Sequence, residues 1–295
     1  MARVLIPVPS IDFDPSEVAV PWRLLRASGH EITFATPDGK AGRADDLMLS
    51  GRGLDPWGFV PGLDRLKVGG LVLRASADAR EAYARLERDP AFVKPLAYAE
   101  LRGADHDALV LPGGHRARGM RAYLESDVLQ SFVSDVFDAG KPVGAICHGV
   151  VLAARSISRK TGRSVLFGKK TTGLTWSLER RGWIAGRILR FWDPGYYRTY
   201  LEQDGEPVGH RSVESEVKRA LASPDDFLDV SPSDPQASRK LSGRHRDTPA
   251  DHGPAFVVRD GAYVSARWPG DANAFAQTLA QAIADVPARR AIRSV

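Results

Sequence analysis

The most constraining feature of this sequence is a junction near its middle, where no loop separates an expected strand from an expected helix. The apolar residues 143–146 (VGAI) are typical of a buried parallel strand, and the apolar stretch 150–157 is typical of a buried helix. Only the three residues CHG at 147–149 lie between them. The residues two positions to either side of Cys147 are alanine and glycine, and such small residues allow a strand and a helix to approach closely. The sequence therefore predicts a nucleophile elbow that presents the Cys147 thiol at the carboxyl edge of a sheet.

The helix that follows Cys147 has a consequence for the acidity of the thiol. The free N–H groups and the dipole at a helix N-terminus stabilise a thiolate. We therefore expect a pKa for Cys147 below that of a free cysteine. The glycine pair Gly113-Gly114, which ends a neighbouring expected strand, could direct backbone N–H groups at an oxyanion formed on attack. His115 follows directly and is expected either at the mouth of the pocket or as a surface loop histidine.

Periodicity elsewhere in the chain predicts an α/β fold. The patterns 3–8 and 31–36 indicate strands on either side of a helix, which makes a right-handed β-α-β unit. We predict a single domain over residues 1–295, with a flavodoxin-like, doubly wound, mostly parallel sheet and the site at its carboxyl edge. Residues 181–254 are expected to be a long insertion that forms a lid or an interface. Further strands are expected at 107–111, 143–146, 165–175, 255–258 and 263–266, and further helices at 125–139 and 272–286.

Composition excludes several classes of protein. The 295 residues are 43% hydrophobic and 26% charged, which is typical of a globular protein. The single cysteine excludes an intramolecular disulfide and a cysteine-based zinc cluster. A net charge of +5 without a block of like charges does not indicate nucleic acid. No apolar run approaches the ~20 residues of a membrane span, and the start of the chain lacks a signal pattern. We expect a cytoplasmic protein with a small-molecule substrate and no metal, cofactor, nucleic-acid or membrane partner.

Two motifs together carry a family resemblance. AICHG at 145–149, preceded by LVLPGGH at 109–115 and an amphipathic helix, resembles the ThiJ/PfpI superfamily, which is related to the class I glutamine amidotransferases. Glu17, four residues before a Pro-Trp pair, and GHEITFATPDG at 29–39 resemble its glutathione-independent glyoxalase and heat-shock chaperone branch, relatives of the parkinsonism-associated deglycase. The resemblance covers residues 1–180 well and 255–286 loosely.

The resemblance implies roles for four residues. Cys147 corresponds to the nucleophile, and Glu17 to the acidic residue that sits against it and shuttles a proton. His148 corresponds to an acid/base partner. A third carboxylate that orients the histidine is expected after residues 168–173, where Glu179 is the only acidic residue near the right place. The alternatives are a solvated glutamate at 179 and a packing role for His148.

The resemblance also implies the activity. It points to a cofactor-independent enzyme acting on small reactive carbonyl compounds, which converts methylglyoxal to lactate as a glyoxalase III-type lyase. An amidase, isocyanide hydratase or other carbon–nitrogen hydrolase or hydratase is the alternative within enzymes. A stress-response chaperone or redox sensor is the alternative of a different class. A homodimer is expected.

Overall fold

The protein is built on a twisted sheet of seven strands, in the order β5-β3-β1-β6-β7-β9-β8. Neighbouring strands pair in parallel except β8, which pairs antiparallel with β9. The computed structural model describes residues 1–286. The strands are β1 (Arg3–Pro7), β3 (Glu31–Thr36), β5 (Leu96–Ala97), β6 (Ala108–Leu111), β7 (Val143–Ile146), β8 (Val257–Asp260) and β9 (Tyr263–Ala266), and a small second sheet pairs β2 (Ile11–Phe13) with β4 (Arg43–Ala44).

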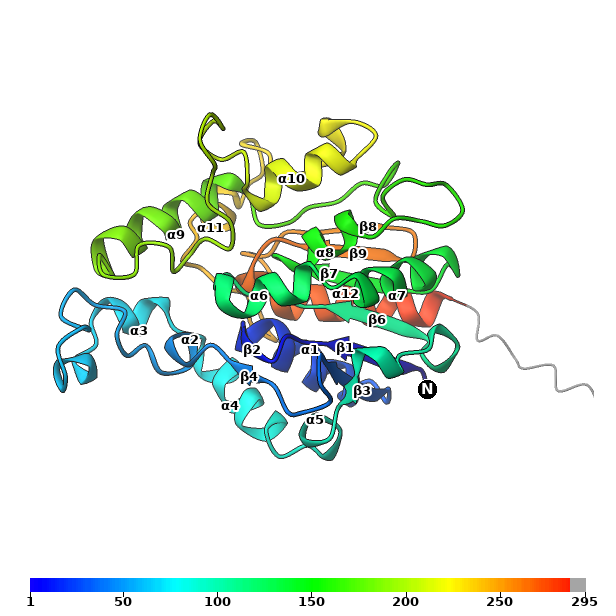
Figure 1. Ribbon diagram of the computed structural model, residues 1–295, viewed down its shortest axis with the longest axis horizontal. Coiled ribbons are helices and arrows are strands. Elements are labelled where there is room, and N and C mark those ends of the chain that lie inside the picture. Colours follow the sequence, from blue (N-terminus) through cyan, green and yellow to red (C-terminus); the bar gives the residue numbers. More distant parts are fainter. Residues whose placement is uncertain (287–295) are drawn as a thin grey trace, which may run out of the picture.

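Helices cover both faces of the sheet, as a doubly wound fold requires (Figure 1). Successive side chains of a strand point to opposite faces, so Val4 and Ile6 join one core while Leu5 joins the other. One face is covered by α1 (Pro15–Ala27), α4 (Ala77–Leu86), α5 (Pro90–Val93) and α12 (Ala272–Asp285), and the other by α6 (Ala117–Leu124), α7 (Asp127–Asp138), α8 (Gly149–Arg155) and α10 (Val213–Ala220). The flavodoxin-like prediction is confirmed.

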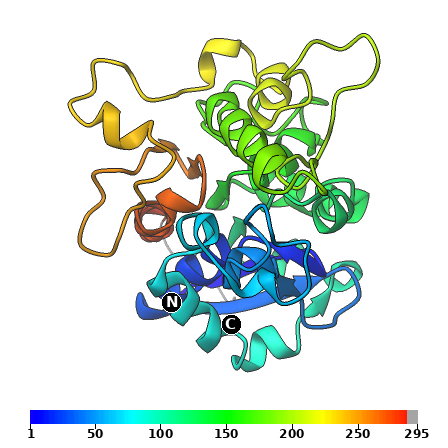
Figure 2. The same cartoon turned by 90° about the vertical axis from the view of Figure 1, so that its left-hand side faces the viewer.

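Two long connections carry further helices. The segment after β4 carries α2 (Asp46–Ser50) and α3 (Gly69–Leu73). The segment after α8 carries α9 (Trp176–Leu189), α10 and α11 (Ala237–Lys240). Figure 2 shows the latter running round the side of the molecule before it returns to β8. Within residues 1–286, no helix combines the length and the apolar character that crossing a membrane requires.

The expected strand at 165–175 is wrong. These residues form turns with two isolated bridges nearby, Ile157 to Ser164 and Thr171 to Phe227. The place beside β7 is taken by β9, whose Ser265 hydroxyl accepts a hydrogen bond from the Thr172 N–H at 2.9 Å. The apolar pattern of 165–175 thus reports burial against β9 rather than pairing within the sheet.

Helix α1 starts earlier than the apolar pattern alone indicates. Asp14 is its N-cap, and one carboxylate oxygen accepts hydrogen bonds from the N–H groups of Ser16 (2.7 Å) and Glu17 (3.2 Å). Pro15 occupies the first helical position, where its missing N–H costs nothing. Glu17 therefore sits in the first turn of α1 and is fully buried, with its backbone carbonyl facing Pro21, which has no N–H to donate.

The junction between β7 and α8 is as tight as the sequence predicts. Cys147 has φ 57°, in the left-handed region that non-glycine residues rarely adopt. A Cβ on Gly149 would lie 2.0 Å from the Leu111 carbonyl oxygen, so α8 begins in direct contact with the end of β6. This close approach places Cys147 at the carboxyl edge of the sheet between β6 and β9.

We predict that Gly149→Ala destabilises the fold, because the added methyl group cannot fit against the Leu111 carbonyl. The expected loss in the free energy of unfolding is about 1–3 kcal/mol or more. Urea denaturation checks it, with Gly195→Ala as control, since a Cβ at Gly195 meets nothing within 4 Å. Equal midpoints for the two variants would contradict the packing argument.

Candidate active site at the β7–α8 elbow

Three buried side chains meet at the elbow. Cys147, His148 and Glu17 are 5%, 2% and 0% exposed. The Cys147 Sγ lies 3.5 Å from His148 Nδ1, and the His148 backbone N–H lowers the pKa of the thiol in opposition to burial. Glu17 Oε2 accepts a hydrogen bond of 2.7 Å from the Gly113 N–H, and the buried carboxyl also interacts with the Cys147 thiol. The structure thus brings together three residues that the sequence singled out.

The glycine pair after β6 closes the floor of the site. A Cβ on Gly113 would lie 2.7 Å from the His148 nitrogen, 2.9 Å from Glu17 Oε2 and 3.1 Å from the Cys147 Cβ, so only glycine fits. The N–H of Gly113 is already taken by Glu17, which corrects the expectation that it faces a substrate oxygen. The Gly114 N–H makes no hydrogen bond within residues 1–286.

Burial sets the protonation of the site. It raises the pKa of Glu17 well above the usual 4.5, with a further rise from the Asp14 charge. Burial also raises the pKa of the Cys147 thiol, to which the Glu17 and Asp14 charges add. This corrects the expectation of an acidic thiol, because desolvation and two carboxyl groups outweigh the start of a seven-residue helix. The resting site holds a protonated thiol.

His148 is neutral at physiological pH. Burial lowers its pKa to about 3, and His115, Arg198 and Arg155 lower it further through their charges. A neutral imidazole beside a thiol can accept the thiol proton. Because its pKa is low, His148 is a weak base, so it can hold the thiol proton only transiently during attack and gives it up readily afterwards.

Glu179 does not reach His148. It lies in the first turn of α9, where one carboxylate oxygen faces Arg198 Nε at 3.1 Å and the other accepts from the Val213 N–H at 3.0 Å. Burial raises its pKa to about 7. The expectation that Glu179 orients the histidine is thus corrected: Glu179 anchors α9 and α10 to the buried Arg198, and through that arginine it acts on His148 only indirectly.

His115 lies in a cage of aromatic rings contributed by the connection after α9. Its ring is 4.7 Å from the rings of Tyr196 and Tyr197, centroid to centroid. The Tyr196 hydroxyl donates to Asp45 at 2.9 Å. Residues of the expected insertion 181–254 therefore form part of the surroundings of the site.

Sequence reasoning missed Asp14 and Arg246. The succession Asp14-Pro15, with Glu17 in the first turn, is an N-cap signature that could have been read from the sequence. Arg246 acts electrostatically on Asp14 and Glu17 from a segment about 100 residues beyond Cys147 along the chain, and nothing in its local sequence signals this. In the part of the chain that the structure describes, no three His, Cys, Asp or Glu side chains are grouped so that they could hold a metal ion.

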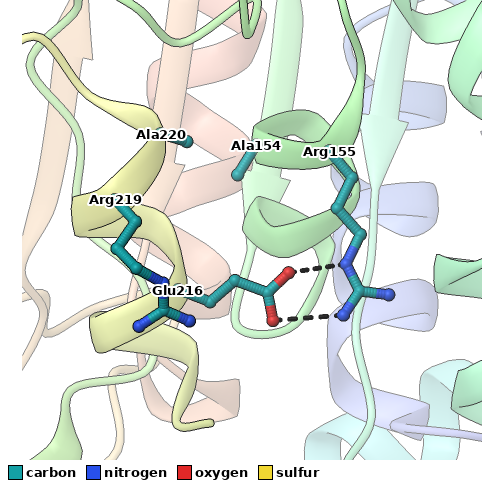
Figure 3. Close-up of a pocket in the computed structure, with 5 residues that line it drawn as sticks. All are labelled: Ala154, Arg155, Glu216, Arg219 and Ala220. Carbon is teal, nitrogen blue, oxygen red and sulfur yellow. Dashed lines mark hydrogen bonds and ion pairs between the residues drawn. The ribbon is translucent and has the colours of Figure 1, made fainter. Parts of the chain in front are cut away.

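A surface pocket of about 320 Å³ lies elsewhere, between the end of α8 and α10 (Figure 3). It is lined by Ala154, Arg155, Glu216, Arg219 and Ala220. Arg155 and Glu216 form a two-point ion pair across it, at 2.6 and 3.1 Å. Arg155 ends α8, whereas Cys147 lies before the start of the same helix. The pocket and the thiol are therefore at opposite ends of α8.

Comparison with known proteins finds one family model and several relatives that are similar to this chain. A family model described as ThiJ/PfpI family-like matches residues 8–209. An uncharacterised protein of Archaeoglobus fulgidus is 32% identical over 106 residues, covering 36% of this chain and 60% of its own. The glutathione-independent glyoxalase HSP31 of Saccharomyces cerevisiae is 23% identical over 159 residues, covering 54% and 58%. The chain thus spans about three fifths of the length of these relatives. The crystal structure of glyoxalase III from Candida albicans superposes with a TM-score of 0.56 at 20% identity, covering 95% of this chain and 97% of that one.

We predict that Asp14→Asn lowers the pKa of Cys147. Asparagine keeps the N-cap, while loss of the buried negative charge favours the thiolate. The rate of alkylation of this single cysteine against pH should shift to lower pH. The control is Asp89→Asn, another buried N-cap aspartate, whose charge is not among those that act on the thiol. An equal shift in both variants would contradict the assignment to Asp14.

Proposed function

Because the chain belongs to the ThiJ/PfpI-like family, we propose that it is a cofactor-independent cysteine enzyme that converts small 2-oxoaldehydes to 2-hydroxy acids, a lyase of the glyoxalase III type. The observation that carries this proposal is the meeting of the Cys147 thiol, a neutral His148 and a high-pKa Glu17 in one buried site. The names of the relatives from Saccharomyces and Candida support a carbonyl substrate.

The first step is addition of the Cys147 sulfur to the aldehyde carbon. As the carbon–sulfur bond forms, the thiol proton passes to His148 Nδ1, 3.5 Å away. The aldehyde oxygen takes up the electron pair of the carbonyl π bond and receives a hydrogen bond from the Gly114 N–H. His148 then returns the proton to this oxygen, which yields a neutral hemithioacetal. The low pKa of His148 makes its protonated form a strong acid for this return.

The second step moves a hydrogen between the two carbons. The Glu17 carboxylate removes the proton from the carbon attached to sulfur and returns it to the neighbouring carbon through an enediol, which produces a thioester. A carboxylate with a raised pKa is a stronger base, and burial supplies that rise. Water then hydrolyses the thioester, releases the 2-hydroxy acid and restores the thiol. The sum is one oxoaldehyde and one water giving one hydroxy acid.

We predict that Cys147→Ala abolishes the production of lactate from methylglyoxal, whereas Glu17→Gln blocks only the second step. Glu17→Gln should lower kcat by about 10²-fold or more and leave a thiol adduct that mass spectrometry detects.

The wild-type rate should rise with pH through the raised pKa of Glu17, because only the carboxylate is a base. Lactate measured by chirally resolved chromatography is the readout.

The same assay separates the proposal from its alternative. Amides and isonitriles are offered to the wild type and to Cys147→Ser in parallel. Turnover of these compounds that depends on Cys147, with none of methylglyoxal, would assign the protein to the carbon–nitrogen hydrolases or hydratases instead.

An exposed apolar surface favours a second candidate function, the holding of unfolded polypeptides. Phe59 packs at 5.4 Å against Phe191 and at 5.2 Å against Trp192, centroid to centroid, yet both phenylalanines are more than half exposed. Other exposed apolar residues occur in the same two segments, namely Leu66, Val68, Leu71, Val72 and Ile188. Exposed apolar surface of this kind is typical of sites that contact other proteins.

We predict that the double variant Phe59→Ser/Phe191→Ser loses any ability to suppress aggregation of a denatured test protein, while Cys147→Ala retains it. Val128→Ser, at an equally exposed site on α7, is the control. Light scattering measures the effect. If the double variant instead converts a dimer to a monomer in sedimentation, without any effect on aggregation, the surface is the interface of the expected homodimer.

A further inference from the structure

Arg246 lies near Asp14 and Glu17 but forms no ion pair with a carboxylate in residues 1–286. Within residues 1–286, its guanidinium has no carboxylate within 4.0 Å; its contacts are the Leu73 carbonyl, at 3.3 Å from Nη2, and the Trp268 ring, 5.3 Å from Cζ to the centroid. Other arginines near the site are paired. The ion pairs are Arg190 with Asp193 at 2.9 Å, Arg198 with Glu179 at 3.1 Å and Arg267 with Asp271 at 2.8 Å. The structure leaves the charge of Arg246 available to a ligand.

The residue next to Arg246 holds it rigidly. The Asp247 N–H donates to the Gly270 carbonyl, and the Asp247 carboxylate accepts from the Ala274 N–H in the first turn of α12, both at 2.7 Å. Asn273 adds a side-chain hydrogen bond of 3.1 Å to the same carboxylate. Arg246 is thereby fixed to the helix that packs against α1, which carries Glu17.

Two more polar groups near Arg246 have no partner. The Tyr197 hydroxyl and His115 Nε2 are both inaccessible to solvent and make no hydrogen bond. The nearest acidic atom to His115 Nε2 is Asp45 Oδ2 at 3.8 Å, which is too long for a hydrogen bond. The ring centroids of His115 and Tyr197 are 4.7 Å apart, so the two rings are in contact. Buried polar groups left unpaired are costly, so a ligand that satisfies them gains affinity.

Arg246, Tyr197 and His115 interact electrostatically with the acidic groups near the thiol. Burial raises the pKa of Asp14, and the charges of Arg246 and His115 oppose that rise. Burial raises the pKa of Tyr197 as well, with Arg246 again opposing. Glu17 is among the acidic groups that act on Arg246. Asp14 is thus a carboxyl on which Arg246 and His115 both act, and it lies one turn of helix from the carboxyl beside Cys147.

We propose that Arg246, the Tyr197 hydroxyl and His115 bind an anionic group of the substrate, so that the enzyme prefers a 2-oxoaldehyde bearing a carboxylate over neutral methylglyoxal. The preference for this substrate class rests on the proposed function, whereas the anion site itself does not. Guanidinium, phenol and imidazole are all hydrogen-bond donors to carboxylate, and the charge of Arg246 offsets the repulsion from Asp14. The reaction is unchanged, with 4,5-dioxopentanoate and water giving 2-hydroxyglutarate.

The first test reports on the anion site without turnover. Iodoacetate and iodoacetamide both alkylate the single cysteine by displacement of iodide and differ only in charge. We expect the ratio of the iodoacetate rate to the iodoacetamide rate to exceed that of glutathione, and to fall about tenfold in Arg246→Gln. A changed thiol pKa affects both reagents alike and cancels in the ratio. Arg244→Gln, at an exposed arginine two residues earlier, should leave the ratio unchanged.

The second test is turnover. Arg246→Gln and Tyr197→Phe should each lower the ratio of kcat/KM for 4,5-dioxopentanoate to kcat/KM for methylglyoxal about tenfold, because any change in the pKa of Glu17 affects both substrates alike. An alkylation ratio equal to that of glutathione, or one that Arg246→Gln leaves unchanged, would overturn the anion site. A lowered ratio in a protein that turns over no oxoaldehyde would keep the site and refute the glyoxalase-type function. Turnover that favours methylglyoxal in the wild type would refute the substrate preference.

Discussion

The hydrogen bond from the Gly113 N–H to Glu17 Oε2, 2.7 Å long, is the interaction on which the site depends. The Asp14 N–H donates in return to the Gly113 carbonyl at 2.9 Å, so the start of α1 and the loop after β6 are joined twice. Because a side chain at position 113 would collide with both Glu17 and the elbow, the absence of a Cβ lets three segments meet. The carboxyl is thereby held against the thiol away from water, and the raised pKa of both groups follows from that placement.

Desolvation, rather than the helix start, determines the chemistry of the thiol. For Cys147, Glu17 and His148 alike, burial is the largest cause of the pKa shift, and in each case it favours the neutral form. Two carboxyl groups and a thiol can be packed together only if most of their charge is absent. The resting site therefore holds neutral groups and not a standing thiolate.

The parts of the site that follow from local sequence could be predicted, and those that follow from long-range packing could not. The strand, Cys147 and helix succession defines the elbow within fifteen residues, and Glu17 is identified by its position relative to the proline and tryptophan of α1. The failed strand at 165–175 and the misassigned Glu179 lie in the connection after α8, where burial comes from distant partners such as Ser265 and Arg198. An apolar pattern reports burial but does not identify the partner.

The position of Arg246 shows how recognition can change while the chemistry is kept. Cys147, His148 and Glu17 lie within the residues matched by the family model, 8–209, whereas Arg246 lies beyond them. It is nevertheless fixed to the shared core, because Asp247 caps the first turn of α12 and α12 packs on α1. With the anion site proposed for Arg246, substitutions in the connection between α10 and β8 would change the preference for substrate charge while Cys147, His148 and Glu17 stay in place.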